Sequence, residues 1–199
     1  MSASLIVPAV EVQPRRKSFT RSDVRRMEEA GVFLGQRFEL IEGDLIDKMG
    51  QNPPHRGALA LVNAYLLERF PASRVLVQIP IEASRADSDR SLPEPDLTVL
   101  AESKAEYWTR HPRGDELALA VEVADSSVSS DLTVKAKLYA RAGVPEYWVL
   151  DIPGRTLVVH RQPEAGQYRQ VTRLGETENV SPESCREGSI AVSALLPPA

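Results

Sequence analysis

Two apolar segments at a fixed separation constrain the fold of this chain more than any other feature. The first reads LALAVEVA over residues 117–124, and the second begins with EYWVLDI at residue 146. Both are long enough for buried strands, and the 21 residues between them (125–145) can form a crossover connection. We therefore expect a right-handed strand–helix–strand unit with two parallel strands.

The connecting segment carries its own helix signals. The stretch SSDLTVKAKLYARAG places apolar residues at helical spacing and ends in a glycine. Ser130 or Asp131 can cap the start of this helix, and Gly143 can end it.

The remaining chain predicts further elements around this unit. We expect a helix over 20–31, a strand pair over 38–49, a helix beginning near His55, strands over 74–83 and 96–101, an irregular stretch over 104–116, and short strands over 155–195. Pro80 weakens the strand over 74–83 or places it at a sheet edge. The predicted fold class is α/β: a mixed central sheet, a helix on each face, and an antiparallel portion built from both termini.

Composition limits the classes of protein that fit. The chain has 199 residues, enough for a single domain over 18–199 after an N-terminal tail over 1–17. Its net charge of −4 gives no global attraction to nucleic acid. A lone cysteine, Cys185, excludes a disulfide within the chain and fits a reducing cytosol. No apolar run approaches the ~18 residues of a membrane span. We expect a soluble cytoplasmic protein that does not enter membranes.

Two carboxylates interrupt otherwise apolar strands. Glu122 lies in the middle of 117–124, where an unpaired charge would be costly to bury. Asp96 opens the strand 96–101, so both carboxylates can reach one site if the two strands pair. Their mutual repulsion would be relieved by a hard divalent cation such as Mg²⁺. The alternatives are a structural salt bridge for Glu122 and a simple turn aspartate for Asp96.

A lysine in the predicted helix adds a third group. Lys135 lies near the start of that helix, where a cation gains nothing from the helix dipole. A helix crossing the sheet could bring its ammonium to the carboxylates, where it could orient water or stabilise negative charge. The alternative is a solvent-facing side chain, as we expect for Lys137.

These residues lie in a pattern that resembles a known family. PEPD before an apolar strand, then AVEVADSS followed by D-x-x-x-K and LYARAGVPEYWVLD, closely resembles the Uma family of bacterial restriction-endonuclease-like proteins. FELIEGDLI and PPHRGALALVNAYL also match, and the resemblance spans roughly 18–196. The family belongs to the PD-(D/E)XK nuclease superfamily. The resemblance implies a restriction-endonuclease-like core: a mixed central sheet flanked by helices, with additional antiparallel strands from the C-terminal part.

The resemblance also implies an activity, metal-dependent cleavage of phosphodiester bonds in nucleic acid. Mg²⁺ or Mn²⁺ would be the cofactor, DNA is the favoured substrate, and a homodimer is left open. Asp96 would be the aspartate of the PD motif and Glu122 the second acid, and together they would hold the metal. The lysine that normally stands two residues after this acid is replaced by Ala124, so Lys135 would supply the amine.

Three further positions follow from the same resemblance. Glu39 would be an additional metal ligand or would activate water, and His55 would contact phosphate or metal. The catalytic set is therefore Asp96, Glu122, Lys135 and Glu39, and the metal-binding set is Asp96, Glu122 and His55. Asp125 stands where many members have serine.

Two other functions stay open from the sequence. The same fold could be a catalytically relict module that binds nucleic acid or protein, which the net negative charge favours. It could also hydrolyse a smaller phosphate ester. A serine hydrolase is excluded because the chain has no G-x-S-x-G motif, so the serines near 126–130 more simply shape a turn.

Overall fold

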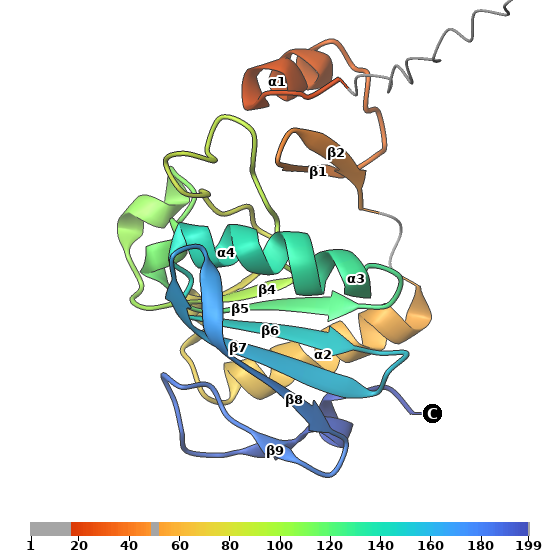
Figure 1. Cartoon of the computed structure of the whole chain (residues 1–199), viewed down its shortest axis with the longest axis vertical. Coiled ribbons are helices and arrows are strands. Elements are labelled where there is room, and N and C mark those ends of the chain that lie inside the picture. Colours follow the sequence, from red (N-terminus) through yellow and green to blue (C-terminus); the bar gives the residue numbers. More distant parts are fainter. Residues whose placement is uncertain (1–16, 49–51, 199) are drawn as a thin grey trace, which may run out of the picture.

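The computed structural model describes residues 17–48 and 52–198, and a six-stranded sheet lies at its centre (Figure 1). In sheet order the strands are β3 (Val75–Val77), β4 (Leu97–Leu100), β5 (Leu117–Ala124), β6 (Glu146–Asp151), β7 (Thr156–Glu164) and β8 (Gln167–Gly175). β5 and β6 pair in parallel, and the other neighbours in this sheet pair antiparallel. The predicted parallel strands and the mixed central sheet are both confirmed.

Helices cover both faces of this sheet, as predicted. One face packs against α2 (Pro53–Leu67), and the other packs against a helix made of α3 (Val128–Ser130), a π-helical turn η4 (Asp131–Lys135) and α4 (Ala136–Ala142). Figure 1 shows this second helix crossing in front of the sheet, with α2 behind it.

The alternation of side chains along β5 explains this two-sided packing. Leu119, Val121 and Val123 join the apolar cluster under α2, whereas Ala120 and Ala124 join the cluster under α4. Because successive side chains of a strand point to opposite faces, both faces of this central strand are buried. Glu122 lies two residues from both Ala120 and Ala124, so its side chain is on the same face of the sheet as theirs, the face covered by α4.

The start of the crossover helix differs from the prediction. It begins at Val128 after Ser127, so neither Ser130 nor Asp131 is its cap. Asp131 lies within the helix, and its carboxylate accepts a hydrogen bond from the hydroxyl of Ser127, the residue that precedes the helix. The predicted end is confirmed, because Gly143 adopts a left-handed φ of 82° that a glycine takes without strain.

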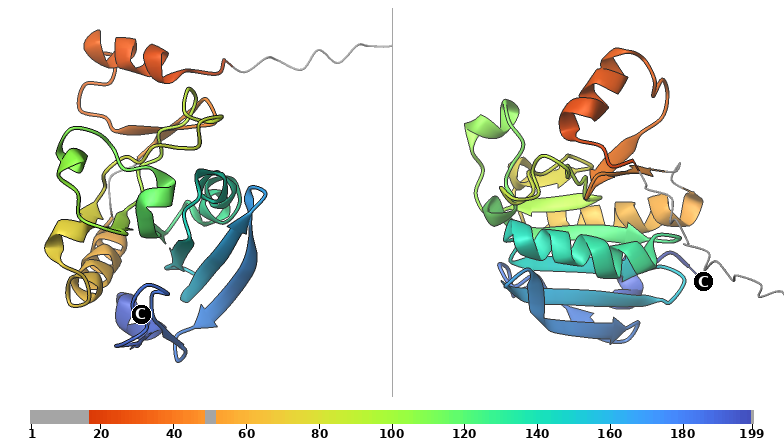
Figure 2. Two further views of the ribbon diagram at one scale, coloured as in Figure 1. Left: turned by 90° about the vertical axis from the view of Figure 1, so that its left-hand side faces the viewer. Right: turned by 45° about the horizontal axis from the view of Figure 1, so that its top comes forward.

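The N-terminal part forms a separate layer at one end of the molecule. It consists of α1 (Arg21–Glu29) and a two-stranded sheet of β1 (Phe38–Ile41) and β2 (Asp44–Asp47). Figure 2 shows α1 and this hairpin stacked together beyond the central sheet. The helix and the strand pair were both predicted. The predicted tail over 1–17 lies outside the described residues as far as residue 16.

Several boundaries needed correction. The helix expected near His55 begins at Pro53 because Asn52 caps it, and β3 ends at Val77 because Gln78 turns away with a φ of 51°. The short strands expected over 155–195 are wrong for β7 and β8, which have nine residues each and extend the central sheet. Most of β8 is exposed at the sheet edge, so it lacks the apolar alternation that marks long strands.

The remaining elements are short. They are the strand pair β9 (Asn179–Val180) and β10 (Ile190–Ala191), and the 3₁₀ helices η1 (Ala72–Arg74), η2 (Ala105–Trp108), η3 (Gly114–Glu116) and η5 (Val192–Leu195). The stretch over 104–116, expected to be irregular, contains two of these 3₁₀ helices. Within the described ranges, every helix is too short or too polar to span a bilayer.

Candidate active site

Asp96 and Glu122 stand opposite each other on paired strands. β4 runs antiparallel to β5 with Leu97 facing Val121, so Asp96, one residue earlier, comes level with Glu122. Both carboxylates are buried, with 4% and 3% of their surface exposed, and both line one cavity of about 720 Å³. The two strands therefore pair, as a site shared by Asp96 and Glu122 requires.

Asp96 is held as a charged carboxylate. Its Oδ2 accepts a hydrogen bond from the Val123 amide at 2.9 Å, and its Oδ1 accepts one from Gln78 Nε2 at 3.3 Å. Burial alone would raise the pKa of Asp96. The contact with the His55 imidazole, the positive charge of Lys48 and the Val123 amide outweigh burial and lower that pKa.

Glu122 is in the opposite situation. Its Oε1 accepts hydrogen bonds from Lys135 Nζ at 3.0 Å and from the Tyr139 hydroxyl at 2.7 Å. Burial raises the pKa of Glu122 to about 8, because the charge of Lys135 offsets only part of the desolvation and nearby acids oppose ionisation. Glu122 therefore forms the salt bridge that was one alternative from the sequence. Its partner is Lys135, the lysine to which the family resemblance points.

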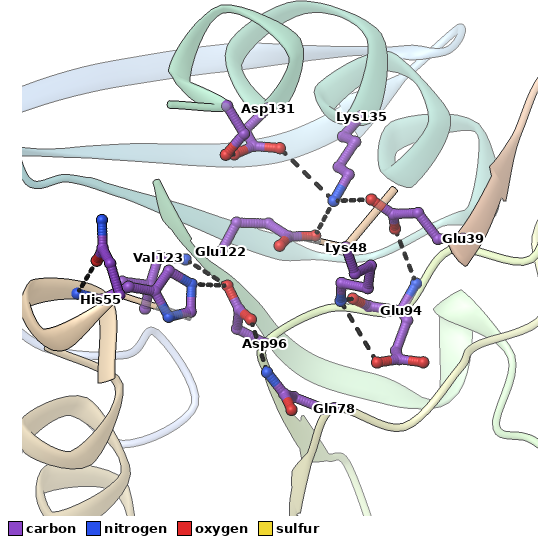
Figure 3. A network of polar contacts seen from close by, with 12 residues as sticks. Glu39, Lys48, His55, Gln78, Glu94, Asp96, Glu122, Val123, Asp131 and Lys135 are labelled. Carbon is purple, nitrogen blue, oxygen red and sulfur yellow. Dashed lines mark hydrogen bonds and ion pairs between the residues drawn. The ribbon is translucent and has the colours of Figure 1, made fainter. Parts of the chain in front are cut away.

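Lys135 lies at the centre of a group of acids (Figure 3). Its Nζ is 2.7 Å from Glu39 Oε1, 3.0 Å from Glu122 Oε1 and 3.6 Å from Asp131 Oδ1. Burial would lower the pKa of Lys135, but these carboxylates outweigh it and raise that pKa well above its ordinary value. The solvent-facing alternative is wrong for Lys135, which is 5% exposed, and correct for Lys137.

Glu39 reaches the site from the N-terminal hairpin. It sits on β1, is 4% exposed, and its Oε2 accepts a hydrogen bond from the Glu94 amide at 3.2 Å. The other oxygen contacts Lys135, so the hairpin contributes a carboxylate to a site built mainly on the central sheet.

His55 approaches from the first turn of α2. Its Nε2 lies 3.4 Å from Asp96 Oδ2, and its Nδ1 is buried and finds no hydrogen-bond partner among the described residues. In this arrangement the imidazole contacts an acid of the predicted metal-binding pair.

Four further polar side chains reach the site. The sequence predicts no site role for Tyr139, Gln78 or Lys48, and for Asp131 it predicts only a helix cap. Tyr139 lies four residues after Lys135, so helical periodicity places both side chains on one helix face. That spacing is the signal in the sequence that points to Tyr139.

The donor set suits a hard divalent cation. Mg²⁺ is usually held by one or two carboxylates together with waters and substrate oxygens. Asp96 and Glu122 supply two, and Glu122 Oε2 enters none of the hydrogen bonds formed by residues 17–48 and 52–198. The cavity lining contains six carboxyl groups and four cationic side chains, so a divalent cation would balance the excess negative charge once Glu122 has released its proton. Within the described part of the chain, no three His, Cys, Asp or Glu side chains are grouped to hold a metal by themselves.

Comparison with known proteins identifies the family. A family model described as "Putative restriction endonuclease", Uma2, matches residues 22–193. The chain belongs to the Uma2 family. The crystal structure of a "putative nuclease belonging to DUF820" from Anabaena variabilis ATCC 29413 is similar to the Uma2 chain described here, with a TM-score of 0.65 and 16% sequence identity. The similarity covers 89% of this chain and 97% of the other, and it shows a shared fold.

The Uma2 match confirms the family to which the sequence pattern was assigned. Together with the six-stranded mixed sheet, the shared fold confirms the predicted restriction-endonuclease-like core. Among curated proteins, none matches this chain.

Proposed function

We propose that this Uma2 protein is a metal-dependent endonuclease that hydrolyses phosphodiester bonds of nucleic acid, with DNA as the favoured substrate. The main support is the contact between Lys135 and Glu122 at the point where Glu122 stands opposite Asp96. Two acids and a lysine converge there on one cavity, inside a family described as restriction endonucleases.

In this proposal Asp96 and Glu122 hold Mg²⁺ or Mn²⁺. The cation would polarise the scissile phosphate and lower the pKa of a bound water. Asp96 is already ionised, whereas Glu122 must release its proton before it can bind a metal. His55 orients the Asp96 carboxylate through its 3.4 Å contact and is close enough to serve as a further ligand or phosphate contact.

Lys135 acts as a fixed positive charge in the proposed reaction. Its ammonium is buried and contacts Glu122, so it can stabilise the negative charge that builds up on the phosphate. Glu39 holds this ammonium from the hairpin side at 2.7 Å, which favours a positioning role over direct metal binding.

Exposed cations at the cavity wall support a substrate longer than one phosphate ester. Arg37 comes from the hairpin side and Arg56 from the α2 side, and both side chains are exposed. They lie where phosphates flanking the scissile one could be contacted. A location in the cytoplasm and a homodimer stay predictions.

A nuclease assay with matched variants tests the proposal. Circular and linear DNA, single-stranded DNA and RNA would be incubated with Mg²⁺, Mn²⁺ or EDTA. We expect cleavage of a circular substrate only with metal. Asp96→Asn, Glu122→Gln and Lys135→Ala should each reduce the rate by about a thousandfold or more.

Two exposed residues outside the cavity lining provide the controls for this assay. Glu102→Gln changes an exposed carboxylate, and Lys137→Ala changes an exposed lysine of the same helix. Both should keep the wild-type rate. Cleavage that survives Asp96→Asn and Glu122→Gln would contradict the proposed mechanism. Metal binding without cleavage would favour the relict module.

A further inference from the structure

The helix that carries Lys135 reverses the usual distribution of polar and apolar side chains. An amphipathic helix normally turns its apolar residues toward the core. Here Asp131 and Lys135 are 1% and 5% exposed, whereas Val134 between them is 37% exposed. Aspartate and lysine are almost never fully buried unless they are paired, so this turn is built to bring two charges inside.

A π-helical turn accompanies this reversal. It spans Asp131–Lys135, the same five residues whose two ends are the buried charges. Asp131, Lys135 and Tyr139 are four residues apart, so helical spacing places all three side chains on the face that is turned toward the cavity and the α4 cluster. The π turn lies at the charged end of this face. Such turns occur often at functional sites.

Asp131 is fixed in place from two sides. Its Oδ2 accepts a hydrogen bond from the Ser127 hydroxyl at 2.5 Å, and its backbone carbonyl accepts one from the buried Tyr147 hydroxyl at 3.0 Å. Its other carboxylate oxygen, Oδ1, is buried and has no hydrogen-bond partner within the described residues. That oxygen faces Lys135 Nζ at 3.6 Å.

Packing alone does not account for this arrangement. Replacing a buried ion pair by apolar residues of similar volume is often neutral or stabilising, so fold stability does not require these charges. The α4 side of the sheet already has an apolar cluster that could extend over this turn. A role in the site is the simpler explanation.

We propose that Asp131 is a positioning residue that holds the Lys135 ammonium in the candidate site. This inference rests on the proposed function. Of the three acids around the ammonium, Glu122 is the one assigned to the cation, so Glu39 and Asp131 remain to fix Lys135. Glu39 belongs to the separate hairpin, whereas Asp131 shares the helix with Lys135 and keeps its position relative to the lysine.

A double-mutant cycle tests this role. Asp131→Asn keeps the side-chain volume and should lower kcat by roughly 10- to 100-fold while KM for the nucleic acid stays unchanged. If Asp131 acts through Lys135, Asp131→Asn should add no further loss to Lys135→Ala. Thr133→Ala, at an exposed position of the same π turn, is the control and should match the wild type. Losses that add in the double variant would overturn the proposal.

A measurement without catalysis separates this inference from the proposed function. In ¹⁵N-lysine spectra, the buried Lys135 ammonium should give a signal that is missing in Lys135→Ala. Asp131→Asn should shift or broaden this signal, and Thr133→Ala should not. If the wild type cleaves nothing, the proposed function fails, and the spectrum still decides whether Asp131 holds Lys135.

A second variant tests the same role if Asp131→Asn does not fold. If Asp131→Asn does not fold, Ser127→Ala takes its place in both measurements, because it removes only the hydrogen bond to Oδ2. The same shift of the ammonium signal and a smaller loss of kcat are expected. An unchanged ammonium signal in the folded variant would refute the positioning role.

Discussion

Two buried glutamates on neighbouring strands behave in opposite ways. Glu122 lies on β5 and Glu146 begins β6, and they are 3% and 1% exposed. Glu146 uses both carboxylate oxygens. Its Oε1 accepts hydrogen bonds from Trp148 Nε1 at 2.8 Å and from Arg161 at 2.6 and 2.9 Å, and its Oε2 accepts one from the Glu183 amide at 2.6 Å.

Glu122 is less completely satisfied. Among residues 17–48 and 52–198, its hydrogen bonds all use one oxygen, and its cationic partner Lys135 is shared with two other acids. It also lines the cavity, which Glu146 does not. The comparison teaches that burial alone does not mark a functional carboxylate. Incomplete neutralisation beside an open cavity is the more specific sign.

The largest effect on stability is expected for the structural glutamate. Glu146→Ala leaves Arg161 without its buried partner and removes the bond to the Glu183 amide. We expect a loss of about 3–5 kcal/mol in the free energy of unfolding, on the order of 10 °C in Tm for a chain of this size. Urea unfolding and calorimetry would measure it.

Glu122→Gln is the matched partner of this experiment. It should abolish nuclease activity with little loss of stability, whereas Glu146→Ala should keep its kcat at temperatures where it is folded. The reverse pattern, with Glu146 needed for activity and Glu122 for stability, would contradict the assignment of a structural role to Glu146 and a functional role to Glu122.

A second effect on stability is expected from pH. The folded protein binds the Glu122 proton more tightly than the unfolded chain, because the pKa is about 8 when folded and 4.5 ordinarily. The resulting stability is complete below about pH 4.5 and is lost as the pH rises to about 8. In metal-free buffer, the stability of Glu122→Gln relative to wild type should therefore increase between these values, by up to a few kcal/mol.

Calorimetry from pH 5 to pH 9 would measure this difference. Subtracting the two proteins cancels the groups that titrate in both. Glu102→Gln, at an exposed position, should show no such trend. A difference that stays constant with pH would mean that Glu122 is ionised throughout.

The smallest effect is expected from metal binding. At ten times its dissociation constant, Mg²⁺ should stabilise the folded protein by about 1.4 kcal/mol, roughly 3–5 °C in Tm. At one fixed Mg²⁺ concentration, the shift should be larger at pH 8.5 than at pH 6, because Glu122 must lose its proton to bind the cation. Asp96→Asn should remove it, and KCl at equal ionic strength controls for screening. An equal shift in Asp96→Asn would place the cation elsewhere.

Part of the site could be predicted because it depends on neighbouring strands. Asp96 opens one apolar strand and Glu122 interrupts another, and antiparallel pairing alone brings them together. The helix after β5 followed from its spacing and from Gly143. The strand–helix–strand core needed only local patterns and chain-length limits.

The rest depends on contacts that local patterns do not encode. Glu39 meets Lys135 only because the N-terminal hairpin docks beside the central sheet, a contact between segments that lie far apart in the chain. The burial of Glu146 could not be predicted, because a glutamate at the start of a strand is ordinarily exposed. Its partners Arg161 and Glu183 come from later segments.

The single ammonium shared by three acids has an evolutionary consequence. Glu39, Glu122 and Asp131 come from three separate segments, and all depend on Lys135 for their counter-charge. A lineage that loses the lysine is left with clustered carboxylates, and selection then favours neutral replacements among them. Across descendants of this protein, these four positions are therefore expected to change together, while the apolar residues under α2 drift independently.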